Sequence, residues 1–306
     1  MKNVPITQSK EWQQLQNDLK EQNFFEKTAD FSYLAILKST PVGNYLYCPY
    51  GPIADTATNF KKALKSLQAL AKTKNAIFIR IEPQNPDFIE YFPKSAKKSH
   101  DLNPKETWLL DLTGNEDGLK QRLPSRLLRY YKNREKQGIT IETSHNPEDI
   151  KQLLKLQKTL AKEKNISTFS EDYLKTELKQ PFATLYLVKQ HQDNREELVA
   201  AGLVFDDKTT RYNLQGAQTD QGRKLHATGI LTIQLILDAK AKNQQIFDFW
   251  GIAPEGAPDN HPWKGFTNFK KTFAGYEKVY AGTYDIVENP LKYRLYQLMR
   301  KIRRLV

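Results

Sequence analysis

The chain has 306 residues, 39% of them hydrophobic, which is long enough for two packed domains. No apolar run approaches the roughly 18 residues of a membrane-spanning helix, which excludes an integral membrane protein. Lys and Arg total 47 against 35 Asp and Glu, and the resulting charge of +12 favours a polyanionic partner such as nucleic acid, a nucleotide-linked substrate or an anionic membrane surface.

Neither the N-terminus nor the cysteine content indicates export. The first residues hold no apolar segment typical of a secretory signal, so we expect a cytoplasmic protein. Cys48 is the single cysteine and cannot form an internal disulfide, which fits a reducing compartment. The five histidines lie far apart and form no paired motif, so we expect no metal and no metal ligands.

Apolar periodicity predicts helices and strands in both halves of the chain. In the first half we expect strands at residues 31–38, 45–48, 76–81 and 107–112, with an amphipathic helix at 56–74. The second half is predicted to contain a helix at 119–137, a strand at 139–143, helices at 147–164 and 170–179, strands at 183–190, 197–205 and 210–218, a helix at 224–242 and a strand at 246–249. This mixture indicates an α/β or α+β fold with a sheet in each half.

The two halves also share a local sequence pattern. Residues 71–78 and 239–247 each run from a Lys/Ala-rich helix end, through Lys-Asn, into an apolar strand. The pattern predicts two copies of one fold with a cleft between them. Gly138, which is suited to closing a helix, marks the boundary. We therefore expect domains at 1–138 and 139–286, followed by a basic helix at 287–306 that packs back on the first domain.

Basic residues concentrate in two segments. Between Lys120 and Lys136 there are seven, against one acid, Glu135, and after Glu288 there are six and no acid. The first segment is either a solvated face over an apolar stripe or a contact for the phosphates of a polyanionic ligand. In the second, apolar residues at helical spacing can pack on the first domain or lie on an anionic bilayer: Leu291, Leu295, Leu298, Met299, Ile302 and Leu305.

Several motifs follow one another in a characteristic order. They are YCPYGPI at 47–53, TWLLDL at 107–112 before the basic segment, NLQGA at 213–217, DFWG at 248–251 and FKKTFAG at 269–275. This order resembles the FemABX family of peptidyltransferases, which use aminoacyl-tRNA to add amino acids to the peptide of peptidoglycan precursors. The resemblance implies two GNAT-like (acetyltransferase-like) domains and no cofactor. The segment from Ile150 to Phe182 is too short for the helical-hairpin arm that some members carry.

The resemblance also implies site residues. Lys270 matches the family's functional lysine in F-K, and its ammonium can stabilise a tetrahedral oxyanion or bind the terminal phosphate of the tRNA; the alternative is a surface lysine beside Lys271. Tyr173 matches a tyrosine near the acceptor pocket, or else packs its helix. Asp248 matches the Asp before the motif glycine, and we expect Lys270, Tyr173 and Asp248 to be catalytic.

Further residues are candidates for binding. For the acceptor substrate these are Tyr212, Arg126, Arg129, Lys38, His261 and Trp263, and for tRNA they are Lys270, Lys271, Lys132 and Arg134. In a family member with a nucleotide-linked substrate, a lysine and an arginine bind the diphosphate, whereas Gln16 and Phe169 stand at those positions here. A lipid-linked acceptor at the inner leaflet is therefore favoured over a UDP-linked one.

The predicted function is transfer of an amino acid from aminoacyl-tRNA to the stem peptide of a peptidoglycan precursor, by a monomer that associates peripherally with the membrane. An acetyl-CoA-dependent N-acetyltransferase is the enzymatic alternative. Its pyrophosphate loop would be Gly-rich, and residues 221–227 fit that pattern poorly. A basic RNA-binding protein is the non-enzymatic alternative, for which Tyr130 and Tyr131 supply aromatic rings beside basic residues.

Overall fold

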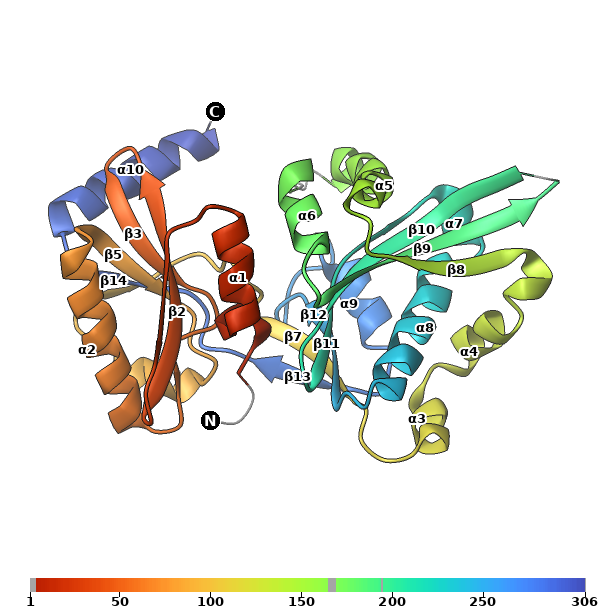
Figure 1. Cartoon of the computed structure of the whole chain (residues 1–306), viewed down its shortest axis with the longest axis horizontal. Coiled ribbons are helices and arrows are strands. Elements are labelled where there is room, and N and C mark those ends of the chain that lie inside the picture. Colours follow the sequence, from red (N-terminus) through yellow and green to blue (C-terminus); the bar gives the residue numbers. More distant parts are fainter. Residues whose placement is uncertain (1–3, 165–168, 194, 306) are drawn as a thin grey trace. The chain divides into compact units, whose positions relative to one another are not determined.

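The chain forms two compact units, each built around its own sheet (Figure 1). The computed structural model describes residues 4–164, 169–193 and 195–305. The first unit comprises residues 1–105 and 279–306, and the second comprises residues 106–278.

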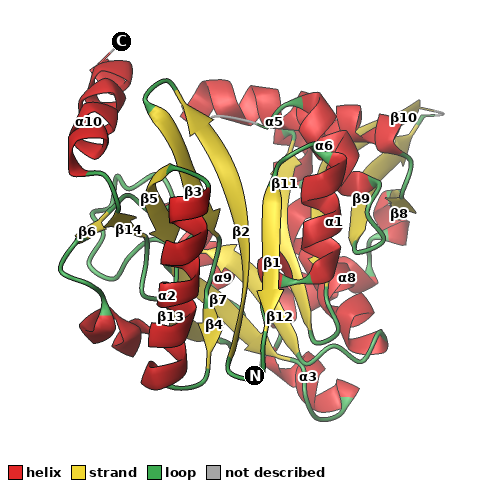
Figure 2. Cartoon of the chain, turned by 60° about the vertical axis from the view of Figure 1, so that its left-hand side comes forward, coloured by secondary structure: helices red, strands yellow, loops and turns green. Residues whose placement is uncertain are grey.

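The first unit has the strand order β1-β2-β3-β5-β14-β6, with β4 paired to β2. In Figure 2 the long strand β2 lies between β1 and β3. Helix α2 buries Phe60, Ala63 and Leu67 against this sheet. Its elements are η1 (Ile6–Gln8), α1 (Lys10–Asp18), β1 (Asn23–Lys27), β2 (Phe31–Thr40), β3 (Gly43–Cys48), β4 (Ile53–Ala54), α2 (Ala57–Thr73), β5 (Ala76–Ile81), η2 (Pro86–Tyr91), β6 (Ala96–Lys98), β14 (Tyr284–Val287) and α10 (Pro290–Leu305).

The second unit has the strand order β13-β7-β12-β11-β10-β9-β8. Figure 1 shows α5 and α6 on one side of this sheet and α8 on the other. The apolar core lies beneath α8 and includes Ile230, Phe247 and Phe249. Its elements are β7 (Glu106–Asp111), α3 (Glu116–Arg122), α4 (Ser125–Lys132), η3 (Glu135–Gln137), β8 (Ile139–Ser144), η4 (Pro147–Asp149), α5 (Ile150–Lys164), α6 (Glu171–Leu178), β9 (Ala183–Gln192), β10 (Arg195–Asp206), β11 (Thr210–Gln218), α7 (Asp220–Lys224), α8 (Ala227–Ala241), β12 (Ile246–Gly251), α9 (Lys264–Lys270) and β13 (Tyr276–Val279).

The shared sequence pattern corresponds to the same structural step in both units. In the first, α2 leads from β3 to its parallel neighbour β5, and in the second, α8 leads from β11 to its parallel neighbour β12. At the end of each helix an asparagine takes the left-handed conformation, Asn75 with φ 51° and Asn243 with φ 58°. Asparagine adopts this conformation more readily than most residues and can close a helix. The expectation of two mixed α/β domains, each with its own sheet, is confirmed.

The units divide the chain at residues other than those expected from Gly138 and residue 287. Strand β7 pairs with β12 and so belongs to the second sheet, although it precedes Gly138. The basic segment that follows β7 also belongs to the second unit, because α4 packs on α8. Between Ile150 and Phe182 the helices of the described residues are α5 and α6, as expected for a chain without a helical arm.

The single helix predicted at residues 119–137 is wrong. The segment contains α3, α4 and the single turn η3 instead, and Leu123 is extended with φ −85° and ψ 148°. Pro124 explains the break, because a proline disfavours helical geometry in the preceding residue and lacks the N–H of a helix interior. Leu119 and Leu123 are nonetheless buried in the core, as the apolar stripe predicted.

Helix α10 packs on the first unit through tyrosines. The rings of Tyr293 and Tyr296 lie 5.3 and 4.9 Å from that of Phe78. The Tyr293 hydroxyl also donates to Asp285 at 3.0 Å, within the buried ion pair of Asp285 and Arg80. The leucine stripe, for which packing on this unit was the favoured expectation, is exposed instead: Leu291, Leu295, Leu298 and Ile302.

Gly138 provides a test of the packing of the second unit. It has φ +66°, and a Cβ there would lie 2.2 Å from the backbone oxygen of His191. We expect Gly138→Ala to lower the free energy of unfolding by at least ~2 kcal/mol in denaturant titrations. Gly256→Ala is the matched control, because Gly256 has φ +73° but no neighbour within 4 Å; its expected cost is about 1 kcal/mol. Equal losses for both variants would contradict the close approach to His191.

Candidate active site

The candidate site lies in the second unit, where β12 ends. β11 and β12 are parallel and pair over Thr210–Tyr212 and Ile246–Asp248 only. Ligands of α/β sheets commonly bind beyond the carboxyl ends of parallel strands. Against β7, the register of β12 shifts between Asp248 and Gly251, and such irregularities re-aim side chains and often lie next to active sites.

Asp248 is buried on β12. Its Oδ1 accepts a hydrogen bond from the Thr107 hydroxyl and another from the backbone N–H of Trp250 at 2.7 Å. Burial raises the pKa of Asp248 to about 6, although both hydrogen bonds and the charge of Lys270 act in the opposite direction. The carboxylate therefore holds the irregular end of β12 in place by bonding to Thr107 on the neighbouring strand β7 and to Trp250 in β12 itself.

Lys270 ends α9, and its Nζ donates to the carbonyl oxygen of Gly251 at 2.6 Å. No carboxylate lies within 4.0 Å of this ammonium in the described part of the chain. Burial lowers the pKa of Lys270 to about 8, while the charge of Asp248 acts to raise it. The alternative of a solvated surface lysine is not what the structure shows, because Lys270 is partly buried and bonded to the backbone.

The two C-terminal motifs meet at this contact. Phe273 is fully buried against Phe249 and Phe269, which fixes the end of α9 next to β12. Gly275 follows, where a Cβ would lie 2.2 Å from the carbonyl oxygen of Leu109 on β7. The spacing F-K-x-x-F-x-G therefore has a structural cause: two rings pack, the lysine reaches β12, and only glycine fits against β7.

Trp250 contacts both Asp248 and the neighbouring strand β11. It has φ +64°, an unfavourable conformation for a large side chain, and strained residues of this kind cluster at functional sites. Its ring stands at 85° to that of Tyr212, with centroids 6.2 Å apart. The Tyr212 hydroxyl donates to Asp207 at 2.8 Å, so this group, predicted to bind substrate, already has a partner.

The loop before α9 carries two more of the predicted residues. The backbone N–H of Trp263 donates to Nδ1 of His261 at 3.1 Å, and the two rings meet edge to face. Trp263 is exposed and caps α9, the helix that ends at Lys270. Lys271 points elsewhere: it pairs with Glu277 at 3.3 Å and lies over the Trp108 ring.

Tyr173 lies on α6, which packs on α5 and β9. Its ring stacks on exposed Phe169 at 5.0 Å, and its side chain hydrogen-bonds to Glu177, one helical turn later. Glu177 is 3% exposed, burial raises its pKa to about 8, and its Oε2 has no hydrogen-bond partner. The sequence prediction did not include Glu177, although the spacing of a tyrosine and a glutamate four residues apart on a helix is a usable signal.

The remaining candidates belong to other elements than those that form the Lys270 contact. Arg126, Arg129 and Lys132 are exposed on α4, and Arg134 is held by the Tyr131 carbonyl and by Glu135. Lys38 belongs to the first unit, where it pairs with Glu21 at 2.8 Å. Gln16, also in the first unit, is buried on α1.

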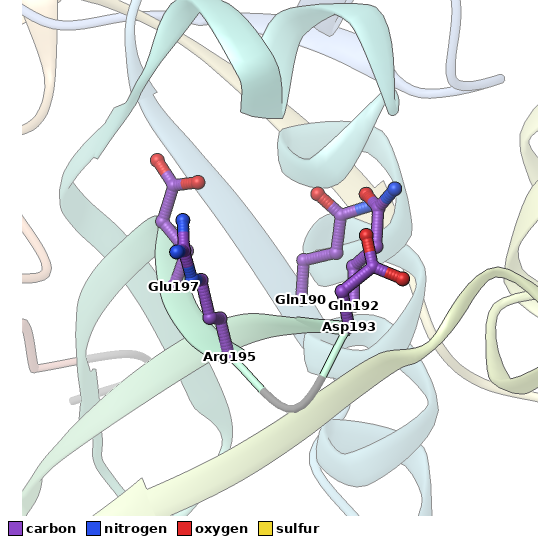
Figure 3. Close-up of a pocket in the computed structure, with 5 residues that line it drawn as sticks. All are labelled: Gln190, Gln192, Asp193, Arg195 and Glu197. Carbon is purple, nitrogen blue, oxygen red and sulfur yellow. The ribbon is translucent and has the colours of Figure 1, made fainter.

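The described residues offer no cluster of three or more His, Cys, Asp or Glu side chains that could hold a metal ion. Within the same residues, no helix is both long and apolar enough to cross a bilayer. Figure 3 shows a polar pocket at the β9–β10 hairpin, with Arg195 and Glu197 facing Gln190 and Gln192. None of the predicted site residues lines it, and its lining, with Asp193 and Glu197 against Arg195, does not favour an anionic substrate.

Two parts of the site were absent from the sequence prediction. The Gly251 carbonyl is a backbone group, so the motif glycine is its only sequence signal. Thr107 was recognised as part of a motif but not as the partner of Asp248. Chemically, the arrangement offers an ammonium of lowered pKa, Lys270, and, beyond ion-pair distance, a buried carboxylate of raised pKa, Asp248. Such a site can stabilise a developing negative charge.

Comparisons with known proteins give a family match and a shared fold. A FemAB family model matches residues 174–301, which include Asp248, Lys270 and both C-terminal motifs. No curated protein matches the chain. Among solved structures, FemX superposes with a TM-score of 0.80 at 16% identity, covering 97% of this chain and 95% of that one.

Two further structures share the fold. A C-terminal domain of a protein described as a lysylphosphatidylglycerol synthetase, from Agrobacterium fabrum, gives a TM-score of 0.61 at 16% identity, covering 95% of this chain and 92% of that one. L-PGS from Bacillus licheniformis gives 0.58 at 15% identity, with 99% of each chain covered. The family match and the shared fold confirm the resemblance to the FemABX family, and they support a transferase in general.

The raised pKa of Asp248 predicts how stability depends on pH. Because the folded state holds this proton more tightly than the unfolded state, the contribution of Asp248 to stability falls as pH rises from about 4 to about 6. Asp248→Asn removes the titration and keeps an Oδ1 acceptor. We expect the difference in unfolding free energy between variant and wild type to shift in favour of the variant across this window, by on the order of 1–3 kcal/mol. A difference that stays constant with pH would contradict the burial of an ionisable Asp248.

Proposed function

We propose that this member of the FemAB family transfers an amino acid from aminoacyl-tRNA to the stem peptide of a lipid-linked peptidoglycan precursor. The observation that supports this most is the Lys270 ammonium bonded to the Gly251 carbonyl at the end of β12. It puts a positive charge where a parallel strand ends, on the helix that follows the loop of His261 and Trp263.

The reaction needs such a charge. The acceptor amine attacks the ester carbonyl carbon of the aminoacyl group, a C–N bond forms, and the carbonyl oxygen becomes an oxyanion. The C–O bond to the ribose then breaks, and the proton lost by the amine passes to the departing ribose oxygen. In this account the Lys270 ammonium moves from the Gly251 carbonyl toward the oxyanion, or binds the adjacent phosphate. Asp248 keeps the strand end fixed while Lys270 changes partner.

The donor is tested by incubating the protein with a pool of charged tRNAs and the lipid-linked precursor, then measuring the mass of the precursor. We expect the added mass of an amino acid, lost when the tRNA is first digested with ribonuclease. Parallel arms supply acetyl-CoA, the UDP-linked precursor and phosphatidylglycerol. Acetyl transfer would favour the acetyltransferase alternative, aminoacyl transfer to phosphatidylglycerol would give a different acceptor, and tRNA binding without any transfer would favour an RNA-binding protein.

Lys270→Met tests the proposed role of the ammonium. Removing a charge that acts on the transition state should cost about 2–4 kcal/mol, or roughly 30- to 1000-fold in turnover. Since Lys270 has no carboxylate partner within 4.0 Å among the described residues, thermal stability should change little. Lys271→Met is the matched control, and we expect it to keep most of the activity. Near-normal turnover in a folded Lys270→Met protein would remove Lys270 from the mechanism.

Two features favour a lipid-linked acceptor. Gln16 and Phe169 stand where a family member with a nucleotide-linked substrate has its diphosphate-binding lysine and arginine, and helix α10 exposes an apolar stripe. The exposed fractions of Leu291, Leu295 and Leu298 are 77%, 48% and 56%. They repeat at helical spacing, and the helix carries basic residues and no acid. An apolar stripe flanked by cations suits the surface of an anionic bilayer.

This proposal predicts salt-sensitive binding to anionic vesicles. Neutralising Arg300, Lys301, Arg303 and Arg304 together should weaken it, although the side chains of the last two lie outside the described part of the chain. Leu295→Gln with Leu298→Gln should also weaken it at least tenfold in vesicle sedimentation. The control pair is Ile89→Gln with Leu102→Gln, which are exposed apolar residues elsewhere. If the intact protein does not bind anionic vesicles at low salt, or dimerises through Leu295 and Leu298, the membrane proposal is wrong.

A further inference from the structure

A second cluster of aromatic and basic side chains lies in the same unit, where α4 packs on α8. The rings of Tyr130 and His226 are stacked, with centroids 4.2 Å apart and an angle of 13° between them. The guanidinium groups of Arg126 and Arg129 lie 5.5 and 5.8 Å from the centroid of Tyr130. Nε of Arg126 also donates to the Tyr130 hydroxyl at 2.9 Å, and this bond lowers the pKa of Tyr130.

The fold holds these groups in position. Arg126, Arg129 and Tyr130 share one face of α4, since they are spaced three and four residues apart. The opposite face packs on the core, where Leu127 meets α8 so closely that a Cβ on Gly229 would lie 2.6 Å from it. His226 precedes α8 with φ +58°, in a left-handed conformation that only a few residue types adopt readily.

The positive charge of the cluster is not neutralised within the protein. In the described ranges, neither Arg126 nor Arg129 pairs with a carboxylate, and Lys132 has no ion pair either. By contrast, Lys120 and Arg134, the nearby basic residues on either side, are paired with Glu116 and Glu135. The imidazole of His226 makes no side-chain hydrogen bond to any described residue. The two guanidinium groups are therefore available to a ligand, beside a stacked pair of rings that is partly exposed.

We propose that the cluster of Tyr130, His226, Arg126 and Arg129 binds the single-stranded end of the donor tRNA, with a base stacked on the Tyr130–His226 pair and phosphates on the two arginines. This inference rests on the proposed function and specifies where that donor is bound. Bases of single-stranded RNA are recognised by stacking on aromatic rings and on guanidinium planes, and the phosphates by unpaired basic side chains. A bilayer would instead favour an exposed aliphatic stripe, which this cluster lacks.

Binding to uncharged RNA tests the cluster independently of transfer. The probes are an RNA hairpin with a four-nucleotide single-stranded 3′ end and the same hairpin with a blunt end, measured by fluorescence anisotropy. We expect wild type to prefer the hairpin with the single-stranded end. His226→Asn keeps a residue that tolerates left-handed geometry and removes the ring; it should reduce this preference about tenfold and leave blunt-end binding unchanged.

The arginines are tested with Arg126→Gln and Arg129→Gln combined. This variant should bind both hairpins more weakly and reduce the slope of log affinity against log salt by roughly one to two. The matched control, Lys179→Gln with Lys208→Gln, removes two exposed charges elsewhere in the unit and should have little effect. Equal affinity of wild type for both hairpins, no effect of His226→Asn, or displacement of the RNA by micromolar coenzyme A would overturn the inference. RNA binding without aminoacyl transfer would support this cluster while contradicting the proposed function.

Discussion

The candidate site depends on one contact, the hydrogen bond from the Lys270 ammonium to the Gly251 carbonyl. A buried charge is stable only where polar groups replace water, and here a backbone oxygen and the more distant charge of Asp248 do so. A carbonyl is a weaker partner than a carboxylate. The ammonium is thus held in place but not neutralised, which is the condition a group needs if it is to act on a developing anion.

The surrounding fold makes this contact possible. β11 and β12 pair over only three residues each, and the register of β12 against β7 shifts between Asp248 and Gly251, which pairs with Thr107. Trp250 is strained at this point, and Asp248 holds it through the Trp250 N–H. Phe273 and Gly275 then bring the end of α9 against β7 and β12. Packing, strain and hydrogen bonding therefore all serve the position of one side chain.

Much of the fold was predictable because it follows from local chemistry. The Lys-Asn pairs ending α2 and α8 revealed the repeated unit, since both asparagines close a helix before a buried strand. The helix predicted across Pro124 is wrong because the basic and apolar periodicity continues through a proline that ends one helix and starts another. On α10 the leucines were expected to pack, but tyrosines form the contact, because Tyr293 can also hydrogen-bond to buried Asp285. That partner is distant in sequence and no periodicity reveals it.

The site was predicted in part for the same reason. Lys270 and Asp248 follow from motifs, whereas the Gly251 carbonyl, the strain at Trp250 and the burial of Glu177 are properties of the folded chain. The stacked pair of Tyr130 and His226 joins residues 96 positions apart, beyond the reach of any local pattern.

The most direct test of the central claim is to titrate Lys270 itself. Lysine side chains labelled with ¹³C and ¹⁵N can be followed by NMR as a function of pH, with Lys270→Met identifying the signal. The account predicts a pKa of about 8, because burial disfavours the ammonium and only a carbonyl is bonded to it. A pKa near the ordinary lysine value of roughly 10.4 would mean a solvated amine, and would contradict the proposed role of Lys270.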